Sequence, residues 1–392
     1  MISTSTLTLA LSLASMTLCS SLPTVSVTNT NTGSSAASSP DPNCTPLTLP
    51  ISINTSASTI SLPNPANQSA LTAFFTALAS PTLDYAQSLV NGTHTVNETF
   101  QISGKLCTPS GQSSGGGVLE FATHGIAFDS AYWEVGGPNS PYNYASSAVA
   151  SNHSIFYYDR LGTGSSSHPS GTQTVQSGVE IEIAHNLIQY FRSGKQGQFD
   201  KIVGVGHSFG SIISYGITAQ YPDDFDDVVL TGYSTGDTTG TLIGAGAFDA
   251  AIASSVFPSM NVPSDYFVPG SFPGYQFDFL RYPNYDPSIA QAQFDIRGTA
   301  TIGEFSTMSS NPPVAPDFKG RVLVVTGLYD TFFCSGNCAE KINGTTPVEL
   351  VKTQYPSANN FTTYVPDDTA HGINLHYSAP EIYSFIEQWI GA

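Results

Sequence analysis

The chain has 392 residues, a length that suits one large domain or one domain with an insertion and that allows a sizeable hydrophobic core. Only 10% of the residues are charged, and 11 Lys and Arg against 29 Asp and Glu give a formal net charge of -18. No basic surface can therefore neutralise nucleic-acid phosphates or attach to an acidic membrane, and we expect neither as a partner. We interpret the acidity as a source of solubility.

The N-terminus has a short apolar stretch from Leu7 to Leu18, followed by small residues. This is the pattern of a secretory signal peptide, although no Lys or Arg precedes the stretch. The stretch is also shorter than the ~20 residues that a transmembrane helix needs. We predict a signal peptide over residues 1–21, a secreted protein and no stable membrane insertion; the alternative is a disordered Ser/Thr-rich tail.

Potential N-glycosylation sites, Asn-x-Ser/Thr, also favour secretion, although a chain rich in Asn, Ser and Thr produces some of them by composition. They begin at Asn43, Asn54, Asn67, Asn91, Asn97, Asn152, Asn343 and Asn360.

The cysteines give a second indication of an oxidising compartment. Five are present, and removal of a signal peptide containing Cys19 leaves an even number. We expect the pairs Cys44–Cys107 and Cys334–Cys338, the second because its members are close in sequence, while other pairings stay open. A zinc site is the alternative for CSGNC, but no further Cys or His pair lies at ligand spacing, so we expect no metal and no cofactor.

Residues 22–65 are rich in Ser, Thr, Asn and Pro, and we expect a flexible lead-in there. A core domain is expected from residue 66. Its first element is a helix within 67–89, because Leu71, Phe74, Phe75, Leu78 and Leu83 recur at helical spacing. A strand around Phe100 and Ile102 follows.

From residue 118 onward, short continuous apolar runs alternate with helical patterns. The expected strands lie in GVLEFATHG, SIFYYDR, DKIVGVGH, FDDVVLTG, GRVLVVTG and FTTYVP, and the expected helices in GVEIEIAHNLIQYFRSG, SIISYGITAQYP and APEIYSFIEQWIGA. Strands of this kind are buried on both faces. The alternation predicts an α/β fold with a doubly wound, mostly parallel sheet, formed by residues 66–233 and 318–392.

Residues 234–317 interrupt the alternation. This stretch is rich in Gly, Pro, Phe and Tyr and shows no clear strand–helix unit. It is too long for a simple loop, so we expect an inserted cap or lid. Its aromatic residues suggest either a pocket for an apolar or aromatic substrate or simple packing of the cap onto the core.

The segment Gly206-His207-Ser208-Phe209-Gly210 matches G-x-S-x-G between an expected strand and an expected helix. A nucleophilic serine on such a sharp turn needs small neighbours at Gly206 and Gly210, because strand and helix pass close together. The helix directs its N-terminal dipole at the site. We predict Ser208 as the nucleophile; the alternative is an ordinary strand–helix turn.

A serine nucleophile needs a base, and the base needs an orienting acid. Asp330 directly follows the GRVLVVTG strand, and we predict it as the acid; its alternative role is to cap the next helix. His371-Gly372 follows the last strand, and we predict His371 as the base. Asp367 and Asp368 lie too near the histidine in sequence, and His376 suits a surface or packing role better.

An oxyanion needs two preorganised N–H donors. We predict the amide of Phe209, which follows the nucleophile, and the amide of Ile126, which follows His124-Gly125 at the end of a strand. The alternative for His124-Gly125 is a plain turn.

With these motifs in order, THG, YDRLGTGSS, GHSFG, GLYD and AHG, residues 115–392 resemble the α/β-hydrolase family in its branch with an inserted cap. The resemblance implies that Asp159, Arg160, Gly162, Gly164 and Ser165 shape the site and are not catalysts. One departure is Ala127, where many members have Pro. Members that open epoxides or remove halides carry Asp at the elbow, so Ser208 implies acyl transfer.

We therefore expect a secreted serine hydrolase that cleaves a carboxylic ester, lactone or thioester through an acyl-enzyme. One alternative is a peptidase of the proline-aminopeptidase kind, with Glu304 or Asp278 holding the substrate amine. Others are a biosynthetic acyltransferase and a non-catalytic binding protein on the same scaffold, which the complete Ser–Asp–His set opposes. The expected partner is a small molecule, and the sequence gives no oligomeric state.

Overall fold

The computed structural model describes residues 43–80, 84–110, 117–235 and 239–392. The predicted signal peptide, with Cys19, and the first part of the predicted lead-in, residues 22–42, lie outside the described residues.

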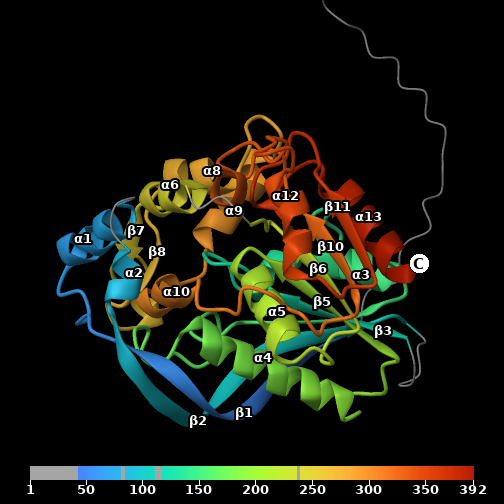
Figure 1. Ribbon diagram of the computed structural model, residues 1–392, viewed down its shortest axis with the longest axis horizontal. Coiled ribbons are helices and arrows are strands. Elements are labelled where there is room, and N and C mark those ends of the chain that lie inside the picture. The colour runs from blue at the N-terminus through green and yellow to red at the C-terminus, as the bar shows by residue number, and fades with distance from the viewer. Residues whose placement is uncertain (1–42, 81–83, 111–116, 236–238) are drawn as a thin grey trace, which may run out of the picture. The chain divides into compact units, whose positions relative to one another are not determined.

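An eight-stranded sheet, in the order β1-β2-β4-β3-β5-β6-β10-β11, forms the centre of the fold (Figure 1). The strands from β4 to β11 run parallel, whereas β1–β2 and β2–β4 pair antiparallel. Their bounds are β1 Asn43–Ile60, β2 Val90–Thr108, β3 Val118–Thr123, β4 Ser154–Tyr158, β5 Lys201–His207, β6 Asp227–Thr231, β10 Arg321–Val325 and β11 Asn360–Tyr364. The predicted doubly wound, mostly parallel sheet is confirmed.

Helices cover the sheet in two groups. Helix α4 packs on α5, and α3 packs on α13; Figure 1 shows α4 and α5 in front of the strands. The α-helices that follow strands of the main sheet are α3 Tyr144–Ala150, α4 Ser177–Arg192, α5 Phe209–Gln220, α11 Thr331–Cys334, α12 Pro347–Leu350 and α13 Ala379–Gly391. Short 3-10 helices are η1 Ser130–Trp133, η2 Pro258–Met260, η3 Val351–Gln354 and η4 Ile373–Leu375. None of the described helices is both long and apolar enough to cross a membrane.

The inner parallel strands are buried because both their faces meet helices, whereas the edge strand β11 is partly accessible. All residues of β4 and β6 are buried, and only the first residue of β3, β5 and β10 is partly accessible. This explains the continuous apolar runs in the sequence, since a strand covered on both faces has no polar side to alternate with.

The prediction of a flexible lead-in over residues 22–65 is wrong for residues 43–60. Residues 43–60 form strand β1, which pairs along almost its whole length with β2. Its buried side chains up to residue 57, Leu49, Ile51, Ile53 and Ala57, recur at every second or fourth residue, as expected for a strand with one covered face, and Ile60 is buried after a shift in register. Because the other face of the strand carries many Ser and Thr residues, the segment has the overall composition of a linker, and the alternation is hard to recognise. The register places Cys44 opposite Cys107, and the expected disulfide joins them.

The helix expected within 67–89 is present in two pieces, α1 Gln68–Leu78 and α2 Tyr85–Ser88. Asn67 is the N-cap residue of α1, because its side chain accepts a hydrogen bond from the N–H of Ala70 at 3.0 Å. Leu83 lies outside the described residues.

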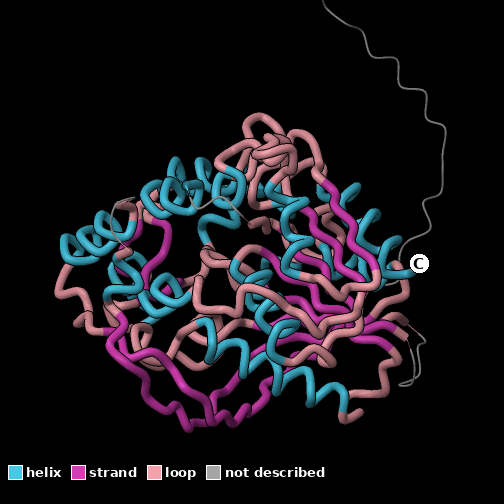
Figure 2. Tube along the Cα trace, viewed as in Figure 1, coloured by secondary structure: helices cyan, strands magenta, loops and turns pink. Residues whose placement is uncertain are grey.

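Between β6 and β10, the chain forms a separate group of elements, which we call the insertion and define as residues 234–317. It contains α6 Thr239–Ala247, α7 Ala253–Val256, α8 Phe272–Phe279, α9 Pro287–Asp295 and α10 Ile302–Thr307, and a small antiparallel sheet of β7 Ala250–Ile252, β8 Tyr266–Pro269 and β9 Ala300–Thr301. In Figure 2, where strands are magenta, these short strands lie apart from the main sheet.

Helix α1 packs on the insertion rather than on the main sheet. The ring of Phe75 lies 5.0 Å from Phe267, 5.3 Å from Phe305 and 6.4 Å from Phe248, measured between centroids. Contacts of this kind bury large apolar areas, so the segment before the main sheet and the insertion share one hydrophobic cluster.

Candidate active site

Ser208 occupies a sharp turn between β5, which ends at His207, and α5, which begins at Phe209. Its backbone has φ 56 and ψ -120, in a region that residues with a side chain rarely adopt. Hydrogen bonds hold this conformation: the Ser208 N–H donates to the carbonyl of Thr231 at 2.9 Å, and its carbonyl accepts from Ser211 N–H at 2.8 Å. A strained turn fixed by its surroundings is the local geometry expected of a nucleophile mount.

Gly206 and Gly210 allow strand and helix to approach at this turn. A Cβ on Gly206 would lie 2.5 Å from the Cα of Ser211, and a Cβ on Gly210 would lie 2.0 Å from the carbonyl oxygen of Thr123. Both contacts are with backbone and cannot be relieved by a side-chain rotation. Any larger residue at either position would separate the elements that position Ser208.

Ser208, His371 and Asp330 come together from the ends of three strands. The Oγ of Ser208 lies 2.8 Å from His371 Nε2, and His371 Nδ1 lies 2.6 Å from Asp330 Oδ2. A carboxylate accepts from Nδ1–H, which leaves Nε2 free to accept the serine proton. The other candidates stay apart: Asp367 and Asp368 are exposed.

His376 is buried, and its Nε2 accepts hydrogen bonds from the N–H groups of Arg281 and Ala370 at 3.0 and 3.2 Å. Burial lowers the pKa of His376 to about 4, so this imidazole is neutral at physiological pH. Its hydrogen bonds hold the loop that contains His371 in place. None of the described hydrogen bonds connects His376 with Ser208.

Aromatic rings surround His371, whose side chain is fully buried. Its ring centroid lies 4.9 Å from Phe332, 5.7 Å from Phe333 and 5.8 Å from Phe279. Because these rings exclude water and fix the plane of the imidazole, Nε2 stays directed at Ser208.

The two predicted oxyanion donors flank the nucleophile. Phe209 is the first residue of α5, and Gly125, before Ile126, packs so closely on Ser208 that a Cβ there would lie 2.7 Å from the Cβ of Ser208. Within the described residues, neither the Phe209 nor the Ile126 N–H donates to a turn, loop or side-chain acceptor. Ala127 has φ 68, which proline cannot adopt, and this accounts for the departure from the family pattern.

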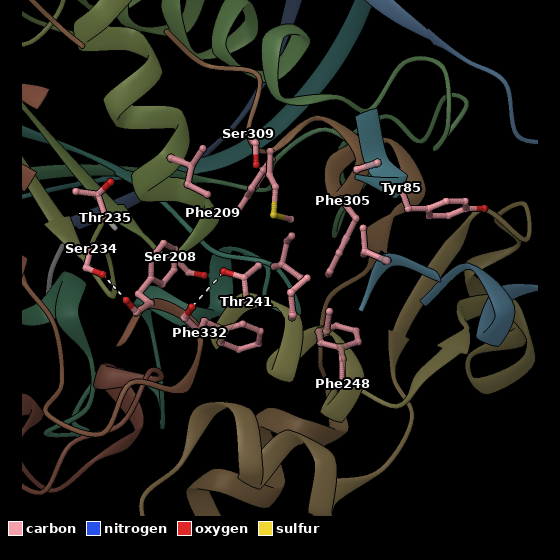
Figure 3. A pocket seen from close by; sticks show the side chains of 18 of the residues that line it. Tyr85, Ser208, Phe209, Ser234, Thr235, Thr241, Phe248, Phe305, Ser309 and Phe332 are labelled. Carbon is pink, nitrogen blue, oxygen red and sulfur yellow. Dashed lines mark hydrogen bonds between the residues drawn. The ribbon is translucent and has the colours of Figure 1, made fainter. Parts of the chain in front are cut away.

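A cavity of about 610 Å³ opens at Ser208 (Figure 3). In the figure, Ser208 and Ser234 lie on one side of the cavity, and Phe305, Phe248 and Tyr85 lie on the other. Its described wall is mostly apolar, with several hydroxyl groups and Asp84 as its one charged side chain. The wall consists of Leu78, Ser80, Asp84, Tyr85, Ala86, Ile126, Ser208, Phe209, Ile212, Ser234, Thr235, Thr241, Leu242, Ala245, Phe248, Phe279, Phe305, Met308, Ser309, Phe332 and Phe333.

The contribution of Leu78, Tyr85 and Ala86 is a feature that the sequence reasoning missed. These residues precede the main sheet by many positions, and their spacing predicts only an amphipathic helix. The long β1–β2 pair connects this segment to the sheet, and the contacts of α1 with the insertion bring it to the cavity wall.

The two acids considered for binding an amine do not line the cavity. Glu304 is fully buried, and its Oε1 lies 2.6 Å from Arg160 Nη1. Asp278 is also fully buried, with neither carboxylate oxygen hydrogen-bonded within the described residues. Burial raises the pKa of Asp278 to about 9, so this side chain is protonated at neutral pH and would offer no charge to an amine.

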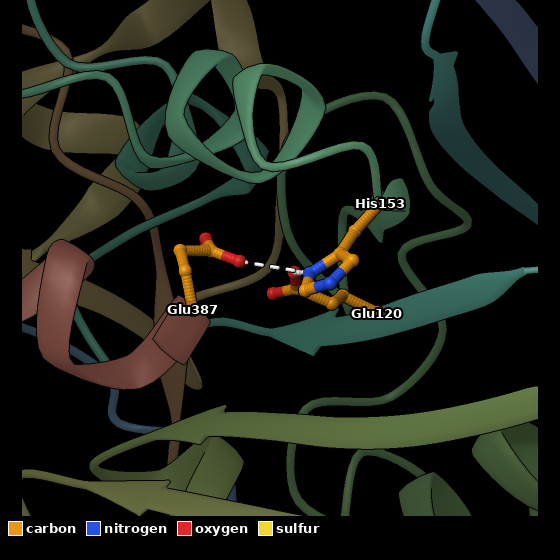
Figure 4. Close-up of side chains that lie close together, drawn as sticks. All are labelled: Glu120, His153 and Glu387. Carbon is orange, nitrogen blue, oxygen red and sulfur yellow. Dashed lines mark hydrogen bonds and ion pairs between the residues drawn. The ribbon is translucent and has the colours of Figure 1, made fainter. Parts of the chain in front are cut away.

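A second group of titratable side chains lies at the opposite edge of the sheet, near the beginnings of β3 and β4. His153 Nδ1 is 2.9 Å from both Glu120 Oε1 and Glu387 Oε2, and all three side chains are buried (Figure 4). Burial lowers the pKa of His153, but the hydrogen bonds to the two carboxylates outweigh this effect and raise it to about 9. The two ion-pair contacts of His153, with Glu120 of β3 and Glu387 of α13, connect this helix to the strand.

The mostly parallel sheet, its helices and the sharp turn at Ser208 are the features of one class of proteins, the alpha/beta hydrolases. The chain belongs to the alpha/beta hydrolase family, because the sequence model of that family matches residues 121–381. No curated protein matches the chain.

Solved structures are similar to the chain at low sequence identity. An esterase from Thermogutta terrifontis is 14% identical, with a TM-score of 0.48 over 74% of this chain and 94% of that one. A monoacylglycerol lipase from Paleococcus ferrophilus is 15% identical, with a TM-score of 0.48 over 72% and 95%. An epoxide hydrolase from Vigna radiata is 13% identical, with a TM-score of 0.49 over 74% and 95%.

Proposed function

We propose that this protein is a secreted serine hydrolase that cleaves a carboxylic ester, lactone or thioester through an acyl-enzyme. The observation that carries the proposal is the hydrogen-bonded line from Ser208 Oγ through His371 to Asp330, with distances of 2.8 and 2.6 Å, at the wall of a cavity. A nucleophile, a base and an acid that orients the base are the groups that acyl transfer requires.

The proposed reaction has two halves. His371 Nε2 takes the proton of Ser208 as its oxygen attacks the acyl carbon, and the N–H groups of Phe209 and Ile126 stabilise the oxyanion. The alcohol or thiol leaves with the proton from His371. Water, activated in the same way, then hydrolyses the acyl-enzyme. Asp330 holds the tautomer of His371 in which Nδ1 carries the proton.

The cavity supports an uncharged, largely apolar acyl group as the substrate. Its wall is mostly apolar and aromatic, and no described Lys, Arg or His side chain lines it. An anionic acyl chain would lose its hydration without gaining a countercharge there. We infer that the insertion, residues 234–317, acts as a cap, because Thr241, Leu242, Ala245 and Phe248 of this segment form part of the wall.

Secretion is part of the proposal. Two disulfides, Cys44–Cys107 and Cys334–Cys338, are compatible with an oxidising compartment. The asparagines of all the potential glycosylation sites named above are exposed, so a glycosyltransferase could reach each of them. Intact-mass analysis before and after endoglycosidase treatment of protein from a eukaryotic host tests occupancy and, from the mature N-terminus, the cleavage site.

The central experiment is labelling with a fluorophosphonate probe, which reacts with activated serines. We expect the wild type to be labelled and Ser208→Ala to be unlabelled but folded. Ser214→Ala is a matched control on the same helix, since the buried Ser214 hydroxyl has no hydrogen-bond partner within the described residues, and this variant should label like the wild type. An unlabelled wild type would contradict the proposal and favour a binding protein.

A substrate panel then separates the reaction types. We expect turnover of neutral esters of several chain lengths and little turnover of aminoacyl amides. Preference for aminoacyl amides would instead indicate an aminopeptidase. An ester product that depends on an added alcohol, with little hydrolysis, would indicate an acyltransferase.

A further inference from the structure

Arg160 is fully buried and contacts the Phe209 ring and the carbonyl oxygen of Gly125, next to the predicted oxyanion donors. Its Nη1 is 2.6 Å from Oε2 of Glu180, in α4, and 2.6 Å from Oε1 of Glu304, in α10 of the insertion. The guanidinium carbon lies 4.8 Å from the centroid of the Phe209 ring. Arg160 is thus in contact with the residue that supplies one donor, and it joins the core to the insertion.

Arg160 also reaches the peptide that supplies the other donor. The carbonyl oxygen of Gly125 accepts a hydrogen bond from His124 Nδ1 at 2.8 Å, and Arg160 Nη2 approaches the same oxygen at 3.5 Å. The backbone N–H of Arg160 donates to His124 Nε2 at 3.1 Å. Nε2 therefore carries no proton, so the proton of His124 is on Nδ1, where it can donate to Gly125.

The protonation state of His124 agrees with this arrangement. Burial lowers the pKa of His124 well below its ordinary value, and the nearby positive charge of Arg160 lowers it further. A neutral imidazole with one donor and one acceptor is what the two hydrogen bonds require.

The Gly125 carbonyl and the Ile126 N–H belong to one peptide unit. Because that unit is planar and trans, its C=O and N–H point in opposite directions. The groups that bind the Gly125 oxygen, His124 and Arg160, therefore also fix the direction of the Ile126 N–H, the predicted oxyanion donor. Rotation of this peptide would remove one oxyanion donor without disturbing Ser208, His371 or Asp330.

We propose that Arg160 is a positioning residue of the oxyanion hole: it fixes the Gly125–Ile126 peptide, directly and through His124, and supports the ring of Phe209. The inference rests on the proposed function, since it needs Ser208 to be the nucleophile. Glu180 and Glu304 hold the guanidinium in place, and Glu304 is itself fixed by the N–H of Thr301, 2.7 Å from its Oε2.

A role in stability alone is a weaker account of this cluster. Buried ion pairs contribute little net stability, because the cost of removing the charges from water offsets their attraction. Here one guanidinium faces two carboxylates, and Arg160 Nε and Glu180 Oε1 lack a partner within the described residues. The contacts that Arg160 makes around Gly125 and Phe209 give it a function beyond neutralising these acids.

The test compares the wild type with Arg160→Lys and Arg160→Met. Lys keeps the charge beside the two glutamates, but its single ammonium cannot also reach Gly125 and cover the Phe209 ring. The readouts are kcat and KM on a neutral ester, and the inhibition constants of a trifluoromethyl ketone and of the matching methyl ketone. The trifluoromethyl ketone adds to the serine and forms an oxyanion, whereas the methyl ketone reports binding of the carbonyl compound alone.

We expect kcat of both variants to fall about tenfold to a hundredfold, below the about 10²–10³-fold cost of removing one donor completely. KM and methyl ketone binding should change less than about threefold, and trifluoromethyl ketone affinity should fall in parallel with kcat. Arg192→Met, which removes a surface arginine paired with Asp226, is the control and should match the wild type. Should Arg160→Met not fold, Arg160→Lys alone decides.

A folded Arg160→Lys with unchanged kcat and unchanged trifluoromethyl ketone affinity would overturn the inference. So would an equal loss of affinity for both ketones, which would indicate a general distortion of the cavity. Fluorophosphonate labelling of wild-type Ser208 is measured in parallel. Its absence would overturn the proposed function itself, so the two failures are distinguishable.

Discussion

Asp330 holds His371 with one carboxylate oxygen and begins a helix with the other. Its Oδ2 lies 2.6 Å from His371 Nδ1, and its Oδ1 accepts a hydrogen bond from the N–H of Phe333 at 2.9 Å, at the start of α11. The sequence presented these as alternative roles. Their combination fixes the plane of the carboxylate, because each oxygen is held by a different element.

Asp330→Asn tests the role proposed for this contact. An amide can still cap α11, but it no longer provides the charge that stabilises the imidazolium and selects its tautomer, so we expect kcat to fall about 10⁴-fold with a small change in KM. Thermal unfolding should change little. Asp368→Asn is the control, since Asp368 is exposed and has φ 53, a conformation that Asn tolerates, and it should keep wild-type kinetics. Retention of more than about a tenth of the activity in Asp330→Asn would contradict the assignment.

Gly210→Ala tests the packing of the turn. Because the new Cβ would lie 2.0 Å from the Thr123 carbonyl, we expect the free energy of unfolding to fall by about 3 kcal/mol or more. Gly178→Ala is the matched control: a Cβ at this position in α4 meets nothing within 4 Å, and stability should rise by up to about 1 kcal/mol. Urea unfolding measures both, and equal stability of the two variants would show that β5 and α5 can separate at little cost.

The disulfides should separate stability from activity. In the chain-entropy model, cross-linking residues 63 positions apart contributes about 4 kcal/mol and cross-linking residues 4 apart about 2 kcal/mol. Replacing Cys44 and Cys107 by Ala should therefore lower stability more than replacing Cys334 and Cys338.

The second pair braces the loop after Asp330, where the Gly336 N–H donates to the Asp330 carbonyl at 2.8 Å. Its removal should lower kcat severalfold, while removal of Cys44–Cys107 should leave kcat unchanged. Denaturant unfolding and ester kinetics on both double variants test this, and the reverse order in either measurement contradicts it.

The cluster of His153, Glu120 and Glu387 should make stability fall in alkaline solution. The pKa of His153 is raised from 6.5 to about 9, so its stabilisation is complete below pH 6.5 and is lost as the pH rises through about 9. Burial, and then the charge of Glu120, raises the pKa of Glu387, which acts in the same direction. Tyr144, which donates to Glu120, stays neutral because burial raises its pKa well above 10.

We expect the free energy of unfolding of the wild type to fall between pH 6.5 and 9 relative to the double variant His153→Gln/Glu387→Gln. At pH 6.5 the wild type should be the more stable, and by about pH 9 much of that difference should be gone. Urea unfolding at both pH values provides the comparison. Parallel pH profiles of the two proteins would count against the cluster as a source of the pH dependence.

Ala245→Trp should shorten the preferred acyl chain. Ala245 is buried in α6 and lines the cavity, so an indole there would fill space near Phe248. We expect kcat/KM for a decanoate ester relative to an acetate ester to fall about tenfold or more, with acetate turnover retained. The control is Ile243→Trp on the same helix, since Ile243 is 45% exposed and does not line the cavity. An unchanged ratio would mean that the acyl group does not enter this part of the cavity.

Much of the fold could be predicted because strands and helices leave local patterns of apolar residues in the sequence. Strands β3, β4, β5, β6 and β10 appear as continuous apolar runs, and α4 appears as a repeating apolar face of Ile181, Leu187 and Ile188, because burial on two faces or on one leaves different periods in the sequence. Strand β1 was misread because its polar face gives it the composition of a linker. Its identity depends on pairing with β2, a partner that no local pattern specifies.

The sequence by itself determined the sheet, the turn around Ser208, and the order in which Ser208, Asp330 and His371 arrive at the ends of their strands, since parallel strands bring such ends to one edge. Only the tertiary structure decided what surrounds them. Three kinds of contact connect residues that are far apart in the chain. They are the hydrogen bonds of His371 with Ser208 and Asp330, the part of the cavity wall formed by Leu78 and Tyr85, and the contact of Arg160 with the Gly125 peptide. Such contacts depend on which elements pack against each other, and the periodicity of an element shows that it has a buried face without specifying its partner.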